Sequence, residues 1–242
     1  MTVSTQFEIS DLTAYHLSLS DQPGYWEDYR GGGSKSQRQD RLEFRQGWQT
    51  VYPTTVEAVL VRVTFTDGSI GWGESNSPIG PEVTALICER LLAPMVRGRS
   101  FDTPAALWDF LYDAQRGRGY AAGYYLDALA ALDIAAWDAI GCRAGLPVAN
   151  LLTQTPRTHL PVYLSGLRQA TVEERIEAMH RWVDTGLKGI KIFVDGDLDA
   201  AGRELETLQQ AAREDIEQWM IDTLWMCRGD DGRRAKAMFG DL

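Results

Sequence analysis

Cysteine and histidine are scarce in this chain. Its 242 residues include only three histidines and three cysteines, Cys88, Cys142 and Cys227. The cysteines are odd in number and none has Cys-x-x-Cys spacing, which argues against a disulfide framework and against a structural zinc site. We therefore expect a protein of a reducing compartment, the cytoplasm.

A surplus of positive charge and long apolar runs are also missing. The formal net charge is -10 and the isoelectric point is about 4.8, which argues against the basic surface that non-specific nucleic-acid binding requires. The N-terminus has no signal-peptide pattern, and no apolar run is long enough to cross a bilayer. We expect no nucleic-acid partner and no membrane partner. The acidity suits a protein that holds a divalent cation, although an acidic surface is the commoner cause.

What the chain does contain begins with a strand pattern. Residues 6–19 alternate with the period of a strand, and two β-rich runs within residues 55–74 flank an Asp67-Gly68 turn. Together these segments predict a three-stranded antiparallel meander.

Helical patterns follow the meander. One begins after Pro81, and a second begins at Pro104 with Thr103 as its candidate N-cap. A third, rich in alanine, begins near Tyr124 and ends at Gly145. The first part of the chain, residues 1–155, is therefore predicted to be an α+β domain.

Residues 20–52 interrupt this pattern with a long, polar, glycine-rich segment. A structureless loop of this length is usually either a functional lid or a solvated insertion. Embedded aromatic residues favour the lid, because disordered segments contain few of them. Those aromatic residues are Tyr25, Trp26, Tyr29, Phe44 and Trp48.

From Pro161 onward, strand and helix patterns alternate. Short apolar runs are separated by amphipathic segments, and this order predicts parallel strands with right-handed crossovers. Residues 156–242 are therefore predicted to form three βα units. The expected strands lie at 161–166, 189–194 and 217–222, and the expected helices at 171–185, 197–214 and 230–240.

Two polar residues stand out at the ends of these apolar runs, Lys191 and Asp222. In α/β folds the carboxyl ends of parallel strands are where ligands bind, so one cation and one carboxylate could face the same pocket. Each residue also has a simpler interpretation. Lys191 could extend its side chain to solvent, and Asp222 could cap a helix.

Four segments of the chain share an order and spacing that is more specific than any one of them. The segments are GWGE at 71–74, ALDIAAWDAIGCRAGLPVANLL at 131–152, GLKGIKI at 186–192 and MID at 220–222. Together they resemble the enolase superfamily, in its mandelate racemase and muconate lactonizing enzyme branch. The resemblance implies an α+β capping domain followed by a (β/α)7β barrel of the TIM type, of which this chain would hold about three βα units.

The resemblance also implies a Mg²⁺ cofactor, held by acidic residues at the ends of three barrel strands. Asp222 matches the first of these ligands. Lys191 matches the first lysine of a Lys-x-Lys motif, which contacts the substrate carboxylate or assists the base. Phe193 stands in place of the second lysine and cannot accept a proton. Substrate contacts are expected from the loop residues, which are Tyr25, Trp26 and Tyr29.

The function that the resemblance implies is removal of the proton α to a carboxylate. We expect a sugar-acid dehydratase, with a racemase, epimerase or cycloisomerase of the same superfamily as the alternative, and assembly into a homo-oligomer. Because two further metal ligands and a base are missing, we expect this chain to be an incomplete and inactive portion of such an enzyme. A protein of another class is also possible, namely a non-catalytic capping-domain protein completed by a partner, and Mg²⁺ titration would distinguish the two.

Overall fold

The computed structural model divides the chain into two compact units, which we describe separately. The N-terminal unit comprises residues 1–22 and 55–158, and the C-terminal unit comprises residues 23–54 and 159–242. Within them, the structure describes residues 4–19, 36–39, 41–45, 50–194, 197–212, 216–224 and 229–240.

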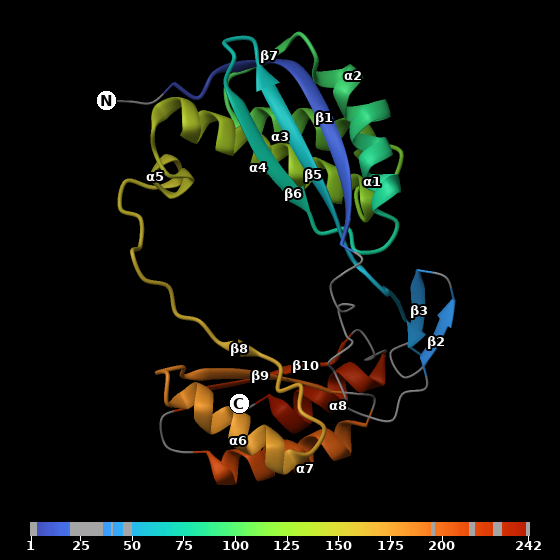
Figure 1. Cartoon of the computed structure of the whole chain (residues 1–242), viewed down its shortest axis with the longest axis vertical. Helices are drawn as coiled ribbons and strands as arrows, with labels where there is room; N and C mark the ends of the chain where they lie inside the picture. The colour runs from blue at the N-terminus through green and yellow to red at the C-terminus, as the bar shows by residue number, and fades with distance from the viewer. Residues whose placement is uncertain are drawn as a thin grey trace. The chain divides into compact units, whose positions relative to one another are not determined.

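A four-stranded antiparallel sheet forms one layer of the N-terminal unit (Figure 1). Strands β1 (Phe7–Leu19), β5 (Val56–Phe65) and β6 (Ile70–Ser75) form the predicted meander. A fourth strand, β7 (Arg99–Phe101), pairs with the other edge of β1. It was not predicted, because three residues are too few to show a strand period.

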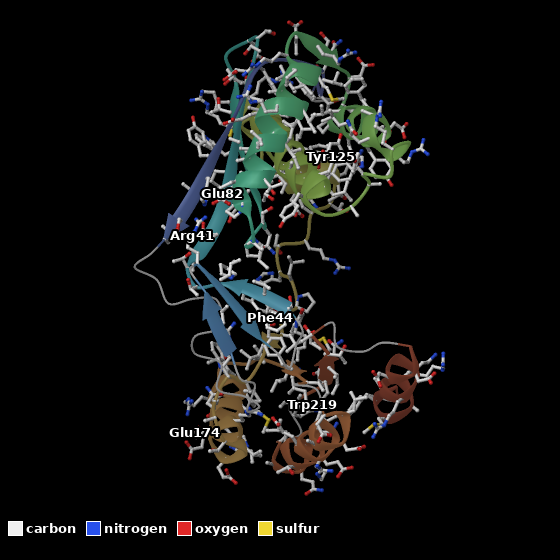
Figure 2. The ribbon with its side chains drawn as sticks, turned by 90° about the vertical axis from the view of Figure 1, so that its right-hand side faces the viewer. Arg41, Phe44, Glu82, Tyr125, Glu174 and Trp219 are labelled. Atoms are coloured by element: carbon white, nitrogen blue, oxygen red, sulfur yellow. The ribbon has the colours of Figure 1, made fainter. Side chains whose placement is uncertain are left out.

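The helices that the structure describes in this unit cover one face of the sheet (Figures 1 and 2). The predicted cap is confirmed, since the Thr103 side chain accepts a hydrogen bond from the backbone N–H of Ala106 at the start of α3. The third predicted helix is also confirmed, and it ends at Gly145 in the left-handed conformation. The elements are α1 (Pro81–Ile87), a π-helical turn η1 (Cys88–Leu92), α2 (Ala93–Val96), α3 (Pro104–Arg116), α4 (Tyr124–Ala144) and α5 (Val148–Leu152).

Helix α4 packs directly against the backbone of β6. A Cβ atom built on Gly73 would lie 2.0 Å from the carbonyl oxygen of Ala131, and one built on Gly71 would lie 2.1 Å from that of Ala135. Both alanines are fully buried. The core of this unit therefore depends on two glycines in the strand that face alanines in the helix.

One half-buried carboxylate on α4 makes stability depend on pH. Burial disfavours the charged form and raises the pKa of Asp133 to about 6 from an ordinary 3.8. The folded state therefore binds this proton more tightly than the unfolded state, so the free energy of unfolding falls as the pH rises from 3.8 through about 6. After discounting for its exposed part, the cost at neutral pH is about 1–2 kcal/mol.

We predict that Asp133→Asn raises the free energy of unfolding by about 1–2 kcal/mol at neutral pH and leaves it unchanged in acid, where Asp133 is protonated in both states. Urea unfolding at a series of pH values measures this difference. The matched control is Asp109→Asn, which changes an exposed aspartate of α3. If Asp133→Asn raised the free energy of unfolding by the same amount at every pH, the prediction would be wrong.

The C-terminal unit contains a parallel sheet in the order β10-β9-β8. The predicted alternation of strands and helices is confirmed, although β8 is shorter than expected. Thr171 and Glu174 form the expected capping box at the start of α6, and Glu174 is labelled in Figure 2. The elements are β8 (Leu164–Ser165), α6 (Val172–Val183), β9 (Gly189–Phe193), α7 (Leu198–Ala211), β10 (Gln218–Asp222) and α8 (Asp230–Phe239).

A second sheet in this unit corrects the interpretation of residues 20–52 as one structureless loop. Strands β2 (Ser36–Gln39), β3 (Leu42–Arg45) and β4 (Thr50–Pro53) pair antiparallel in that order. Each of these strands has only four residues, which is too short a run for alternation in the sequence to identify a strand. The aromatic residues Tyr25, Trp26 and Tyr29 lie outside the described residues.

Among the helices that the structure describes, none combines the length and the hydropathy needed to cross a bilayer.

Candidate active site at the carboxyl ends of β9 and β10

The register of β9 and β10 brings Lys191 and Asp222 together. Met220 pairs with Lys191, and Asp222 pairs with Phe193 two residues further along the strands. Because Ile190 is buried against the helices, the alternation of the strand directs Lys191 to the opposite face of the sheet. Asp222 lies on that same face.

The two charged groups form an ion pair. Lys191 Nζ lies 3.0 Å from Asp222 Oδ2, and the two side chains are 21% and 34% exposed. The pair is thus half-buried yet accessible from solvent at the carboxyl ends of the strands. This is the place where the sequence predicted a site.

A tight turn holds the other oxygen of the Asp222 carboxylate. The backbone N–H of Leu224 donates a hydrogen bond to Asp222 Oδ1 over 3.0 Å. Leu224 has a φ of 48°, a left-handed conformation that a branched side chain rarely adopts. The backbone of Leu224, rather than its side chain, therefore contacts the site.

Two aromatic rings lie beside the ammonium group. The Lys191 Nζ atom is 5.4 Å from the centre of the Phe193 ring and 5.8 Å from the centre of the Tyr163 ring. Tyr163 was missed as a site residue, and only its position two residues before Ser165, which pairs with Lys191, could have indicated it.

Two of the histidines are engaged elsewhere. In the N-terminal unit, His16 Nε2 lies 2.6 Å from Glu57 Oε2. In the C-terminal unit, His180 Nε2 lies 2.9 Å from the carbonyl oxygen of Ala211, on the helical side of the sheet. Neither contact places an imidazole beside Asp222.

The donor atoms of this site fit one ligand position of a hard divalent cation. Asp222 offers a carboxylate oxygen, which is the ligand type that Mg²⁺ prefers. In this structure the carboxylate pairs with a cation, the Lys191 ammonium group. In the part of the chain that the structure describes, however, no three residues of the types His, Cys, Asp and Glu gather into a metal-binding group. Asp222 could therefore be one ligand of such a site, which needs further oxygen donors to be complete.

A pocket of about 280 Å³ with a mixed polar and apolar lining lies on the opposite face of β10, lined in part by Trp219, Ile221 and Phe239. Trp219 and Ile221 pack with the buried cluster on the helical side of the sheet, and Trp219 is labelled there in Figure 2. This pocket is therefore separate from the face that carries Lys191 and Asp222.

Comparison with known proteins agrees with this architecture. Residues 40–153 match the family model described as "Mandelate racemase / muconate lactonizing enzyme, N-terminal domain". A solved structure of an enolase-superfamily member from Agrobacterium tumefaciens is 32% identical, with a TM-score of 0.84, and the match covers 98% of this chain and 60% of that one.

Two curated relatives are named for their reactions. A D-galactonate dehydratase family member from Paenibacillus sp. (strain JDR-2) is 32% identical over 138 residues, which are 57% of this chain and 33% of the relative. A D-galactarolactone cycloisomerase from Agrobacterium fabrum is 32% identical over 108 residues, which are 45% of this chain and 28% of the relative. The matched part of the chain thus spans about a third of these relatives. From its N-terminal domain and its parallel strands, this chain belongs to the enolase superfamily, in the mandelate racemase and muconate lactonizing enzyme family.

Proposed function

We propose that this chain supplies the capping domain and the first barrel strands of a Mg²⁺-dependent enzyme that removes the proton α to a carboxylate. The observation that carries the proposal is the Lys191–Asp222 pair, half-buried at the carboxyl ends of adjacent parallel strands. Active sites of TIM-type barrels lie at that end of the strands.

The two residues have different roles in this proposal. Asp222 is one metal ligand, held in place by the backbone N–H of Leu224. Lys191 binds the substrate carboxylate, because its ammonium group is charged, partly exposed and on the same face. When bound, the metal ion would neutralise negative charge that develops on the carboxylate oxygens as the proton leaves.

Dehydration of a sugar acid is the reaction that we propose. Loss of the α proton from a polyol acid leads readily to departure of the β-hydroxyl, and one relative is named as a member of a dehydratase family. Racemisation, epimerisation and cycloisomerisation begin with the same step, and another relative is named as a cycloisomerase. Phe193 cannot act as a base, so we propose that the base and the remaining ligands lie on other barrel strands and that this chain alone is inactive.

A substrate screen tests this proposal. The chain is expressed alone and together with any coding sequence that continues past Leu242, and each protein is incubated with a panel of acid sugars and Mg²⁺. We expect the longer protein to release 2-keto-3-deoxy acids, the products of dehydration, and the chain alone to release none. Conversion of acyl amino acids or dipeptides, with no acid sugar turned over, would reject the substrate class.

The alternative of a non-catalytic protein has its own outcome. If the protein is non-catalytic, calorimetric titration shows no Mg²⁺ binding to the chain alone or to the longer protein, and neither converts a substrate. Assembly into a homo-oligomer also stays a proposal, which light scattering after size exclusion would measure.

A further inference from the structure

We propose that Phe193 and Tyr163 are positioning residues that hold the Lys191 ammonium group against Asp222. The functional importance of Lys191 rests on the proposed function, but the arrangement itself does not. Phe193 therefore has a role of its own at the position where a second lysine was expected.

One ring lies on the same strand as Lys191, and the other lies next to the neighbouring strand β8. Phe193 follows Lys191 by two residues on β9, so both side chains lie on the same face of the sheet. Tyr163 immediately precedes β8, and its ring centre lies 5.8 Å from Lys191 Nζ, close to the 5.4 Å of Phe193. Both distances lie within the range over which an aromatic ring attracts a cation.

A glycine lies close to each aromatic residue, Gly166 to the ring of Phe193 and Gly189 to the Cβ atom of Tyr163. A Cβ atom on Gly166 would lie 2.1 Å from Phe193 Cε2, and one on Gly189 would lie 3.0 Å from Tyr163 Cβ. Gly166 also has a φ of +89°, which favours glycine, and its N–H donates to the carbonyl oxygen of Lys191 over 2.8 Å. The backbone that orients Lys191 thus also forms the space for the Phe193 ring.

The Lys191 side chain is flexible, so its position depends on the groups around it. A lysine side chain is a flexible four-carbon stem with a strongly hydrated end, so a single carboxylate fixes its position poorly. Here two ring faces and the Asp222 carboxylate limit where the ammonium group can lie. We infer that the rings keep it beside the carboxylate, ready for a ligand that binds there.

The small number of lysines makes this inference directly measurable. The chain contains four, Lys35, Lys188, Lys191 and Lys236. Labelling with ¹³C-lysine gives four Cε–Hε signals, which Lys→Arg variants assign one by one. We expect the Hε protons of Lys191 to be shifted upfield by the ring currents, with inequivalent geminal protons. Lys188 is the internal control, because it is an exposed lysine paired with Glu217.

Three variants separate positioning from folding. In Phe193→Leu we expect the Lys191 signal to move toward the position of an exposed lysine, while the Lys188 signal stays. Phe193→Tyr restores the shift, because an aromatic face returns. Gly166→Ala, which displaces the ring, should resemble Phe193→Leu if it folds.

Two results would overturn the inference. One is a Lys191 signal at the position of an exposed lysine in the unchanged chain. The other is an upfield signal that Phe193→Leu does not move although the variant is folded. Because the experiment needs neither metal nor substrate, a failure of the substrate screen leaves it unaffected, and its own failure leaves the proposed reaction untouched.

Discussion

Gly73→Ala is expected to cost about 3 kcal/mol or more of folding stability, enough to unfold a marginally stable N-terminal unit. The new Cβ atom would lie 2.0 Å from the carbonyl oxygen of Ala131 and 2.8 Å from the backbone nitrogen of Ala135, both in α4. A helix backbone cannot rotate away as a side chain can, so β6 and α4 must separate. Urea unfolding followed by circular dichroism measures the loss.

The matched control for this prediction is Gly117→Ala, at the end of α3. A Cβ atom there meets nothing within 4 Å, and the residue has a helical φ of -64°. This change should be neutral or stabilise by up to about 1 kcal/mol, because alanine has fewer unfolded conformations than glycine. If the Gly73→Ala and Gly117→Ala variants have equal free energies of unfolding, the close packing of α4 on β6 does not contribute the predicted stability.

Asp222→Asn should lower kcat/KM at least about a hundredfold in a protein that carries the complete active site. Loss of even an outer-shell partner commonly reduces metal affinity or activity by 10- to 100-fold, and Asp222 is proposed as a ligand itself. Asparagine keeps the size of the side chain and an oxygen that can accept from the Leu224 N–H, but it removes the charge. Turnover of an acid sugar and calorimetric Mg²⁺ binding measure the two effects.

Asp199→Asn is the control for Asp222→Asn, since it removes an aspartate of the same unit that pairs with Arg234 at an exposed surface. It should leave turnover and metal binding unchanged. Chelation with EDTA should abolish turnover by the unchanged enzyme, and added Mg²⁺ should restore it. An Asp222→Asn variant with full activity and unchanged Mg²⁺ affinity would show that Asp222 is not a ligand.

Much of the fold was predictable because local physical signals agree with the tertiary structure. The Thr103 cap, the Thr171–Glu174 capping box and the left-handed Gly145 each stop or start a helix where the sequence indicates. The alternation in β1 and β5 follows from a sheet of which one face is covered by the described helices of this unit. Strands β2, β3, β4 and β7 were missed because they have three or four residues each, and pairing with distant residues defines them.

The candidate site was predictable only in part. Strand-end position identified Lys191 and Asp222 as residues that could share a pocket, and family resemblance supplied their expected roles. The distance between them, the turn at Leu224 and the ring of Tyr163 could not be predicted. Each depends on which residue of one strand lies opposite which residue of the next, and the roles of Tyr25, Trp26 and Tyr29 stay predictions.

The sequence by itself determined the order of the elements, the type of each domain and the chemical nature of the polar strand-end groups, because caps, glycines and apolar periodicity act over a few residues. Only the tertiary structure decided that Lys191 pairs with Asp222, that Phe193 lies over Gly166 and that α4 contacts the bare backbone of β6. Those contacts arise from strand register and from steric fit between segments that are far apart in the chain, which no local pattern encodes.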